Sequence, residues 1–187
     1  MPQTTPAVPR VPQGEPGAGA ASSDDPEPDT PLLLRPPTLA DGAHMWRLAR
    51  DSGSLDLNTS YAYLLFARDF ARTCRVAVVE GEVVGFVLGY RRPEAPDTLF
   101  VWQVAVDPAV RGRRVAGRLL ADVTVGSRWL EATITADNTA SQRLFARFAR
   151  EHGAEVVRSE LFAADHFPDG HDAEGLVRIG PLPTTES

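Results

Sequence analysis

Residues 99–120, LFVWQVAVDPAVRGRRVAGRLL, decide the fold of this chain. The segment up to Val106 is rich in β-branched and aromatic side chains, which predicts a buried strand that ends at Asp107-Pro108. A helix is predicted to begin near Val115, because apolar residues then recur at helical spacing. The basic, glycine-containing loop at 111–114 lies where the free amides and the dipole of a helix N-terminus attract phosphate. The stretch therefore predicts a strand, a diphosphate-binding loop and a helix in succession.

Composition limits the class of protein. The 187 residues suggest one domain, and a net charge of −6 argues against a nucleic-acid or anionic-membrane surface. The single cysteine, Cys74, excludes an internal disulfide and a multi-cysteine zinc site, and is typical of the reducing cytoplasm. All 19 basic residues are arginine, which excludes lysine Schiff-base chemistry and a lysine-containing phosphate loop. No apolar run is long enough for a membrane span, and the N-terminus does not resemble a signal peptide.

The first 31 residues differ from the rest of the chain. They contain eight prolines and almost no large apolar side chains, so burial cannot offset the entropy of ordering them. We expect a disordered, solubilising tail at 1–31, with a partner-binding arm as the alternative. A single folded domain is expected over 32–182, followed by a short tail at 183–187.

Hydrophobic periodicity and turn residues predict seven strands and four helices in the order β-α-α-β-β-β-α-β-α-β-β. A Pro-rich loop is expected at 92–97, between the third and fourth strands. The strands are expected at 32–35, 75–80, 83–91, 99–106, 129–134, 156–162 and 175–179, and the helices at about 38–51, about 60–71, from 115, and at 140–152.

This order, with a V-x-V strand leading into R-G-x-x-V-A at a helix start, resembles the GNAT superfamily of N-acetyltransferases over residues 32–182. The resemblance implies the GNAT acyl-CoA N-acyltransferase fold, an α/β (α+β) architecture with about seven strands in a mixed sheet and about four helices. It also implies that the fourth and fifth strands splay apart, and that acetyl-CoA, the co-substrate, wedges into the gap.

The resemblance assigns the residues that bind acetyl-CoA. Backbone groups of Val104 and Val106 would contact the thioester and the pantetheine arm, and Asn138 would also contact CoA. The pyrophosphate would be held by Arg111, Gly112, Arg113, Arg114, Val115 and Ala116.

Two positions depart from the superfamily pattern. Arg114 stands where the pattern (Gln/Arg)-x-x-Gly-x-(Gly/Ala) has its middle glycine, so the backbone there loses the freedom of glycine. Phe145 stands where many members have a tyrosine that protonates the leaving thiolate. The residue that would act as general acid is therefore not identified.

Four segments resemble a narrower family, the L-2,4-diaminobutyrate acetyltransferases of the ectoine pathway. They are DLNTSYAY at 56–63, FVWQVAVDP at 100–108, LEATIT at 130–135, and FPDGH at 167–171 with its continuation to Ile179-Gly180-Pro181. The implied reaction moves an acetyl group from acetyl-CoA to the γ-amine of L-2,4-diaminobutyrate, giving the N4-acetyl product. That amine must lose a proton before it attacks, and a strand N–H near Val104 is the candidate donor to the tetrahedral oxyanion.

The acceptor site is assigned from these segments. Asp56 is predicted to bind a substrate ammonium, with a helix-capping or turn role as the alternative. Tyr61 is predicted to act in catalysis and substrate binding as a hydroxyl donor, ahead of Tyr63, while ordinary packing is the alternative for both. Trp102 follows the two-residue alternation of Phe100 and Val104, which places the three on one face of the strand and by itself favours core. The resemblance instead predicts that Trp102 forms a wall of the acceptor pocket.

Glu131 is an acid within an otherwise apolar strand, so it requires a partner or a function. It is predicted either to pair with an arginine or to accept the amine proton through water. His171 is a candidate for contact with the substrate or with a second copy, since the implied family usually forms homodimers. The spacing of the histidines does not favour a metal site, and none is predicted.

Two other functions remain open at this point. The chain can be an acetyltransferase for another diamine or amino acid, or a CoA-binding module without catalysis. Turnover across a series of diamines would separate the first alternative, and CoA binding without thiol release would indicate the second. The arginine cluster at 111–114 also admits a nucleic-acid or localisation patch, which the acidic net charge disfavours.

Overall fold

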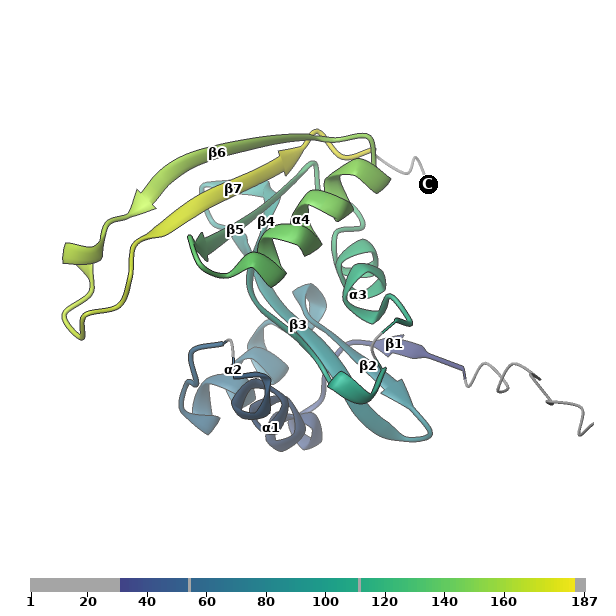
Figure 1. Ribbon diagram of the computed structural model, residues 1–187. Coiled ribbons are helices and arrows are strands. Elements are labelled where there is room, and N and C mark those ends of the chain that lie inside the picture. The colour runs from purple at the N-terminus through teal and green to yellow at the C-terminus, as the bar shows by residue number, and fades with distance from the viewer. Residues whose placement is uncertain (1–30, 54, 111, 184–187) are drawn as a thin grey trace, which may run out of the picture.

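The structure is a computed structural model, and it describes residues 31–53, 55–110 and 112–183. These residues form one seven-stranded sheet and four α-helices (Figure 1). The strands are β1 (Leu33–Arg35), β2 (Arg75–Val79), β3 (Glu82–Arg92), β4 (Ala95–Val106), β5 (Trp129–Thr135), β6 (Glu155–Phe162) and β7 (Glu174–Gly180). The helices are α1 (Gly42–Ser52), α2 (Ser60–Asp69), α3 (Val115–Val123) and α4 (Thr139–Glu151). The predicted order of strands and helices is confirmed.

Parts of the expected organisation fall outside the described residues. The tails expected at 1–31 and 183–187 lie outside them apart from Pro31 and Pro183, as does Arg111 of the predicted pyrophosphate loop. Within the described part of the chain, no helix is long and apolar enough to cross a membrane.

The sheet separates two apolar clusters. Its strand order is β1-β2-β3-β4-β5-β7-β6, and every neighbouring pair is antiparallel except β4 and β5. Helices α3 and α4 bury Leu119 and Phe148 against one face, while α1 and α2 bury Met45 against the other. The two pairs of helices lie apart in Figure 1, and β6 and β7 extend as an arm beyond them. Helix α4 packs on one face of the sheet at β7. The opposite face of β6 and β7 has no covering helix among the described elements (Figure 1).

Strands β4 and β5 splay apart, as predicted. Their parallel pairing joins residues 98–101 to residues 129–132 and then ends. Yet β4 continues to Val106 and β5 to Thr135. The sheet therefore opens between them at its middle, and backbone groups on the facing edges become available to a ligand.

A β-bulge at Trp102 changes which side chains share a face of β4. Its neighbours Val101 and Gln103 pair with consecutive residues of β3, so Trp102 is the extra residue. A uniform alternation placed Val104 on the face of Trp102, and this expectation is wrong. Val104 packs on the cluster beneath α3 and α4, whereas Trp102 packs on the cluster beneath α1 and α2. The bulge thus brings Trp102 and Gln103 to the same side of the sheet.

The loop expected at 92–97 is shorter than predicted. Arg92 pairs with Ala95, so β3 and β4 form a hairpin around the turn at Pro93-Glu94. Pro96 lies near the start of β4, where a strand tolerates a residue without an N–H group. The two prolines were interpreted as marks of a loop, whereas only the first lies in the turn.

Arg114 adopts a backbone conformation that favours glycine. It is the N-cap of α3, with φ +57° and ψ +25° in the left-handed region, and its side chain makes no capping hydrogen bond. The departure from the superfamily pattern therefore falls at a position where glycine has a physical advantage.

We expect the exchange Arg114→Gly to raise the free energy of unfolding by about 1 kcal/mol, because an L side chain costs roughly that much in the left-handed region. Arg118→Gly, an exposed position within the same helix, is the matched control and should lower it by about 1 kcal/mol. Urea denaturation measures both. Equal destabilisation by the two exchanges would show that Arg114 is not strained.

Candidate functional site

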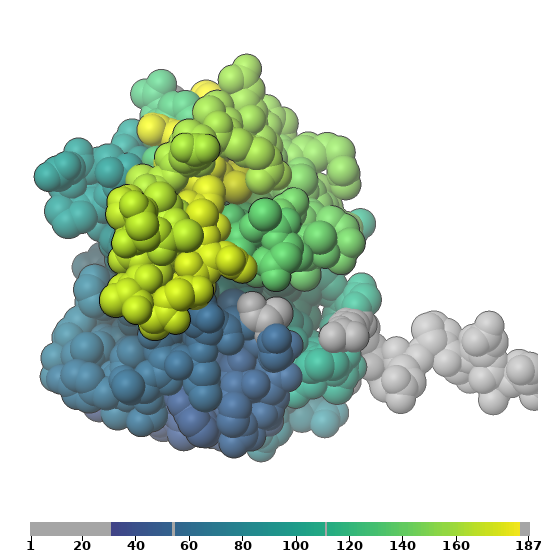
Figure 2. Space-filling model, turned by 60° about the vertical axis from the view of Figure 1, so that its left-hand side comes forward, coloured from purple at the N-terminus to yellow at the C-terminus, as the bar shows by residue number. Residues whose placement is uncertain are grey.

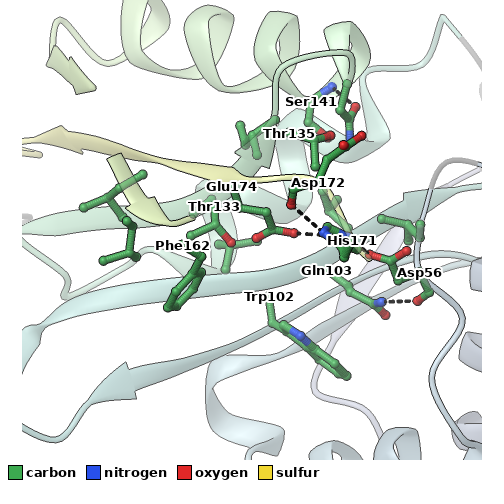
Figure 3. Close-up of a pocket in the computed structure, with 18 of the residues that line it drawn as sticks. Asp56, Trp102, Gln103, Thr133, Thr135, Ser141, Phe162, His171, Asp172 and Glu174 are labelled. Carbon is green, nitrogen blue, oxygen red and sulfur yellow. Dashed lines mark hydrogen bonds and ion pairs between the residues drawn. The ribbon is translucent and has the colours of Figure 1, made fainter. Parts of the chain in front are cut away.

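A cleft of about 1420 Å³ occupies the opening between β4 and β5. Six segments that are distant in sequence form its walls (Figure 3). They are the α1–α2 connection at 55–58, β3 at Tyr90 and Arg92, β4 at 100–104, β5 at 131–135, the start of α4 at 137–145, and the β6–β7 connection with its flanking strands at 161–176. The cleft therefore extends from the start of α4 to the α1–α2 connection.

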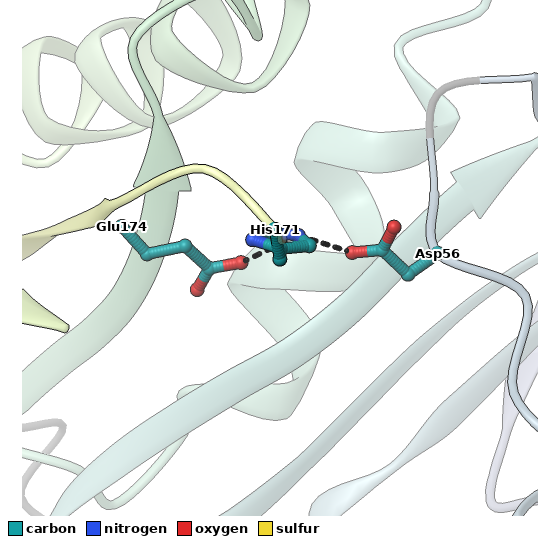
Figure 4. Close-up of side chains that lie close together, drawn as sticks. All are labelled: Asp56, His171 and Glu174. Carbon is teal, nitrogen blue, oxygen red and sulfur yellow. Dashed lines mark hydrogen bonds and ion pairs between the residues drawn. The ribbon is translucent and has the colours of Figure 1, made fainter. Parts of the chain in front are cut away.

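An acidic cluster lies in the cleft where the β6–β7 connection meets the α1–α2 connection. His171 Nε2 lies 2.9 Å from Asp56 Oδ2 and 3.8 Å from Glu174 Oε1 (Figure 4). Figure 2 shows the yellow end of the β6–β7 arm resting against the blue segment that contains residue 56. The Asp56 side chain is 74% exposed, so its carboxylate remains open to a ligand. The cluster closes one end of the cleft.

The chemistry of this cluster suits a cation. The three residues offer one imidazole nitrogen and two carboxylate oxygens within 4.8 Å of one another, which are donor types that can hold a metal ion. Two carboxylates beside one imidazole equally suit a substrate ammonium. Hydrogen bonds to the Asp172 carbonyl and the Asp56 carboxylate raise the pKa of His171 above its usual value. Asp56 and His171 were each predicted to bind the substrate, but their contact was not predicted because they are 115 residues apart, and Glu174 was missed.

Trp102 lines the cleft. Its ring stacks on Phe66 of α2, with centroids 4.7 Å apart and planes 12° from parallel. The bulge and this stacking hold the indole at the point where β4 leaves β5.

The two predicted tyrosines do not line the cleft. Tyr61 is 64% exposed on the outside of α2, and the structure does not bring it to the other predicted residues. Tyr63 is fully buried, and its hydroxyl donates to Gln103 Oε1 at 3.0 Å. Gln103 Nε2 in turn donates to the Asp56 carbonyl at 2.8 Å (Figure 3). Gln103 was missed, although a polar residue in the apolar strand FVWQVAV carries the same signal that singled out Glu131.

Glu131 lines the cleft and is 2% exposed. Its Oε2 accepts a hydrogen bond from Arg92 Nη1 at 3.0 Å, and Arg178 Nη1 lies 3.5 Å from its Oε1. Oε1 is buried without a hydrogen-bond partner among the described residues. The predicted pairing with an arginine is therefore present, and two arginines take part in it, while the role of proton acceptor stays a prediction.

Two of the residues predicted to bind acetyl-CoA line the cleft, and the others that the structure describes lie outside its lining. Val104 and Asn138 line the cleft, and the Asn138 side chain caps α4 by accepting from the Ser141 N–H at 3.0 Å. Val106 lies further along β4, beyond the lining residues. Gly112, Arg113, Arg114, Val115 and Ala116 form the approach to α3 and its first turn.

Phe145 borders the cleft from α4 and is 2% exposed. It supplies a wall and no proton. Hydroxyl groups do reach the cleft at Thr133, Thr135 and Ser141 (Figure 3). Of these, Thr135 donates to Asp137 at 2.7 Å.

Comparison with known proteins gives a consistent result. The sequence model of the family described as "Acetyltransferase (GNAT) family" matches residues 43–149. A Streptomyces coelicolor protein named L-2,4-diaminobutyric acid acetyltransferase is 56% identical over 161 residues, which cover 81% of this chain and 94% of the relative. A protein of the same name from Streptomyces avermitilis is 53% identical over 159 residues, which cover 81% and 89%.

A solved structure is also similar over most of the chain. It is the diaminobutyrate acetyltransferase EctA from Paenibacillus lautus, in complex with its substrate L-2,4-diaminobutyric acid and coenzyme A. The TM-score is 0.77 at 39% identity, and the match covers 84% of this chain and 99% of that one. The Ard1 protein from Thermoplasma volcanium, with a TM-score of 0.63 at 18% identity, shares the fold.

Proposed function

This chain belongs to the acetyltransferase (GNAT) family, among the L-2,4-diaminobutyric acid acetyltransferases, and we propose on that premise that it acetylates L-2,4-diaminobutyrate at its γ-amine. Acetyl-CoA is the acetyl donor, and N4-acetyl-L-2,4-diaminobutyrate and CoA are the products. The observation that carries the proposal is the acidic cluster of Asp56, His171 and Glu174 in the cleft where β4 and β5 separate. The product would then enter ectoine biosynthesis.

The donor compartment would bind acetyl-CoA along the open edge of β4. Backbone groups of Val104 and Val106 would contact the thioester and the pantetheine arm. The residues at 111–116 and the free amides at the start of α3 would hold the pyrophosphate, because those amides and the helix dipole attract anions. Asn138 would contact CoA from the start of α4.

The acceptor compartment would hold the amino acid by its ammonium group. The carboxylates of Asp56 and Glu174 attract a cation, and His171 holds them side by side. Trp102 would wall the compartment next to the thioester. We assign no substrate contact to Tyr61, because its side chain lies outside the cleft. Anchoring the α-ammonium away from the thioester leaves the γ-amine as the group that reacts.

Chemistry would begin with loss of a proton from the γ-ammonium to Glu131, through water. The free amine then attacks the thioester carbonyl, and a β4 N–H near Val104 donates to the oxyanion that forms. When the tetrahedral intermediate collapses, the carbon–sulfur bond breaks and the CoA thiolate leaves. The nitrogen loses its second proton to give the neutral amide, and this proton passes through the site to the thiolate and converts it to the thiol.

The proposed reaction is tested by thiol release from acetyl-CoA with L-2,4-diaminobutyrate, followed by mapping of the acetylated nitrogen. We expect release that depends on the amino acid and acetylation at the γ-nitrogen. A parallel series of ornithine, lysine and polyamines should give lower kcat/KM. Faster turnover of any of these amines, or acetylation at the α-nitrogen, would contradict the proposal.

The KM for L-2,4-diaminobutyrate is expected to fall as pH rises through the pKa of His171. Protonated His171 pairs with Asp56 and so competes with the substrate ammonium. Because its pKa is raised above 6.5, the charged form persists above pH 6.5 and is lost only as pH rises further. His171→Gln should remove this dependence, which KM values measured across that pH range will reveal. Parallel pH profiles of KM in the two proteins would refute the competition.

We further propose that two copies of the chain pair through β6. All eight residues of this edge strand are exposed, including Val157 at 55%, Leu161 at 42% and Phe162 at 40%. An edge strand with apolar side chains on both faces favours association with another chain. The cytoplasm is the proposed location, since acetyl-CoA is the co-substrate and the one cysteine is buried and reduced.

The exchange Val157→Glu is expected to convert a dimer into a monomer of 20.2 kDa, because it places a charge within the apolar contact. Light scattering coupled to gel filtration measures the mass. Val125→Glu is the matched control, since Val125 is 65% exposed at the far end of α3. A wild-type protein of monomer mass would exclude the pairing.

A further inference from the structure

Two polar side chains are buried together inside the apolar cluster beneath α1 and α2. Tyr63 is fully buried and Gln103 is 5% exposed. Burying a phenol and an amide is unfavourable unless each finds hydrogen-bond partners. Their partners are each other and the backbone of the α1–α2 connection.

The pair holds that connection at two points. The Gln103 amide nitrogen donates to the Asp56 carbonyl at 2.8 Å. The Tyr63 hydroxyl donates to the Gln103 amide oxygen at 3.0 Å and also hydrogen-bonds to the backbone of Asn58. Burial raises the pKa of Tyr63, so the hydroxyl keeps its proton and remains a donor. Residues 56 and 58 are thereby fixed to one buried unit.

Gln103 also belongs to the strand that would hold the acetyl donor. It follows the bulge residue Trp102 and precedes Val104, and all three residues line the cleft. The carboxylate of Asp56 extends from the other side of the same residue whose carbonyl Gln103 binds (Figure 3). One side chain therefore links the donor strand to the acidic end of the acceptor compartment.

We propose that Gln103, supported by Tyr63, is a positioning residue that sets the distance between the Asp56 carboxylate and the acetyl group, and thereby the binding of the substrate α-ammonium. This inference rests on the proposed function. The bulge makes this contact possible, because it turns Gln103 toward α2 and Tyr63 while Val104 points to the opposite face of the sheet. Tyr63 thus acts on the substrate through Gln103 rather than by contact.

If Gln103 positions Asp56, its replacement should affect the binding of two substrate analogues differently. L-2-aminobutyrate keeps the α-ammonium and lacks the γ-amine, whereas 4-aminobutyrate lacks the α-ammonium. A displaced Asp56 carboxylate should weaken only the binding of L-2-aminobutyrate, because only this analogue has the α-ammonium. Asp56 keeps one other donor to its carbonyl, the Asn58 side chain at 3.2 Å, so the connection should shift rather than unfold when Gln103 is replaced.

The experiment measures KM for both substrates and inhibition constants for the two analogues in full-length Gln103→Leu. We expect KM for L-2,4-diaminobutyrate and the inhibition constant of L-2-aminobutyrate to rise by about tenfold, the equivalent of one or two lost hydrogen bonds. The inhibition constant of 4-aminobutyrate and the KM for acetyl-CoA should stay within about twofold of wild type. Tyr63→Phe, a milder change that keeps the ring, should shift the same two constants by about threefold.

A control for general destabilisation is Val76→Ala, which removes volume from the same cluster without touching the connection. It should leave all four constants unchanged. Equal weakening of both analogues in Gln103→Leu and Tyr63→Phe, or no change in either, would overturn the inference. If instead wild-type protein does not acetylate L-2,4-diaminobutyrate, or Asp56→Asn leaves its KM unchanged, the proposed function itself fails.

Discussion

Exchange of Glu131 for Gln is expected to lower kcat with L-2,4-diaminobutyrate by about 10²- to 10³-fold, with the KM for acetyl-CoA within about twofold of wild type. Glutamine has the shape of glutamate and still accepts the Arg92 hydrogen bond, but it cannot take up a proton. The carboxylate borders the cleft, and one of its oxygens has no hydrogen bond among the described residues, so it keeps a lone pair for the amine proton. Steady-state kinetics at saturating concentrations of both substrates measures the effect.

The competing interpretation of Glu131 is a structural ion pair, and Arg92→Gln separates the two. This exchange breaks the 3.0 Å pair from the other side and leaves the carboxylate in place. If Glu131 is the base, Arg92→Gln should keep most of kcat. If Glu131 serves only in a structural ion pair, Glu131→Gln and Arg92→Gln should lose activity and stability equally. Glu160→Gln, an exposed exchange on β6, controls for the loss of one negative charge. Unchanged turnover in Glu131→Gln would remove Glu131 as the base.

Asp56→Asn is expected to raise the KM for L-2,4-diaminobutyrate by about 10- to 100-fold while changing kcat much less. A hydrogen bond between charged groups contributes about 1.5–3 kcal/mol, and the amide keeps the shape of the side chain without its charge. The KM for acetyl-CoA should not change, because the cluster of Asp56, His171 and Glu174 lies at the acceptor end of the cleft.

The matched control for Asp56 is Asp165→Asn. Asp165 is exposed in the β6–β7 connection, which also contains His171, and it does not line the cleft, so its exchange alters the net charge equally. Titration calorimetry with L-2-aminobutyrate provides a second measure, since heat of binding should be lost in Asp56→Asn alone. A KM that rises equally in both variants would mean that the effect comes from overall charge.

Much of the fold follows from local sequence. Gly53 and Gly153 end α1 and α4 in the left-handed conformation that glycine adopts without strain, and Asn138 caps α4 with its side chain. These signals act over a few residues, so they are visible in the chain itself. The boundaries that were wrong are those of the loop at 92–97, the start of the first helix and the end of α2. Pro96 lies in a strand rather than in the loop, and 3₁₀ turns at Leu39–Asp41 and Ala71–Thr73 stand where α-helix was predicted.

The sequence predicted some residues of the candidate site but not their contacts, because residues that meet in the cleft are far apart in the chain. Trp102 and Glu131 stand out locally as unusual residues in strands. Tyr63 was predicted to bind the substrate because it lies in the segment DLNTSYAY, which carries the family resemblance. In the structure it is buried, and its hydroxyl donates to Gln103. The local sequence alone determines neither the hydrogen-bond partner of a buried side chain nor the exposure of a tyrosine on a helix.

By itself, the sequence determined the element order, the strand–loop–helix unit of residues 99–120, and membership of an acetyltransferase family, since all three depend on local patterns and motif order. Only the tertiary structure decided which side chains meet. It brings His171 to Asp56 across 115 residues and divides β4 between two faces at Trp102. It also places Glu131 between two arginines from β3 and β7. Such contacts depend on strand register and on a one-residue bulge, and a shift of one residue reverses every side chain that follows.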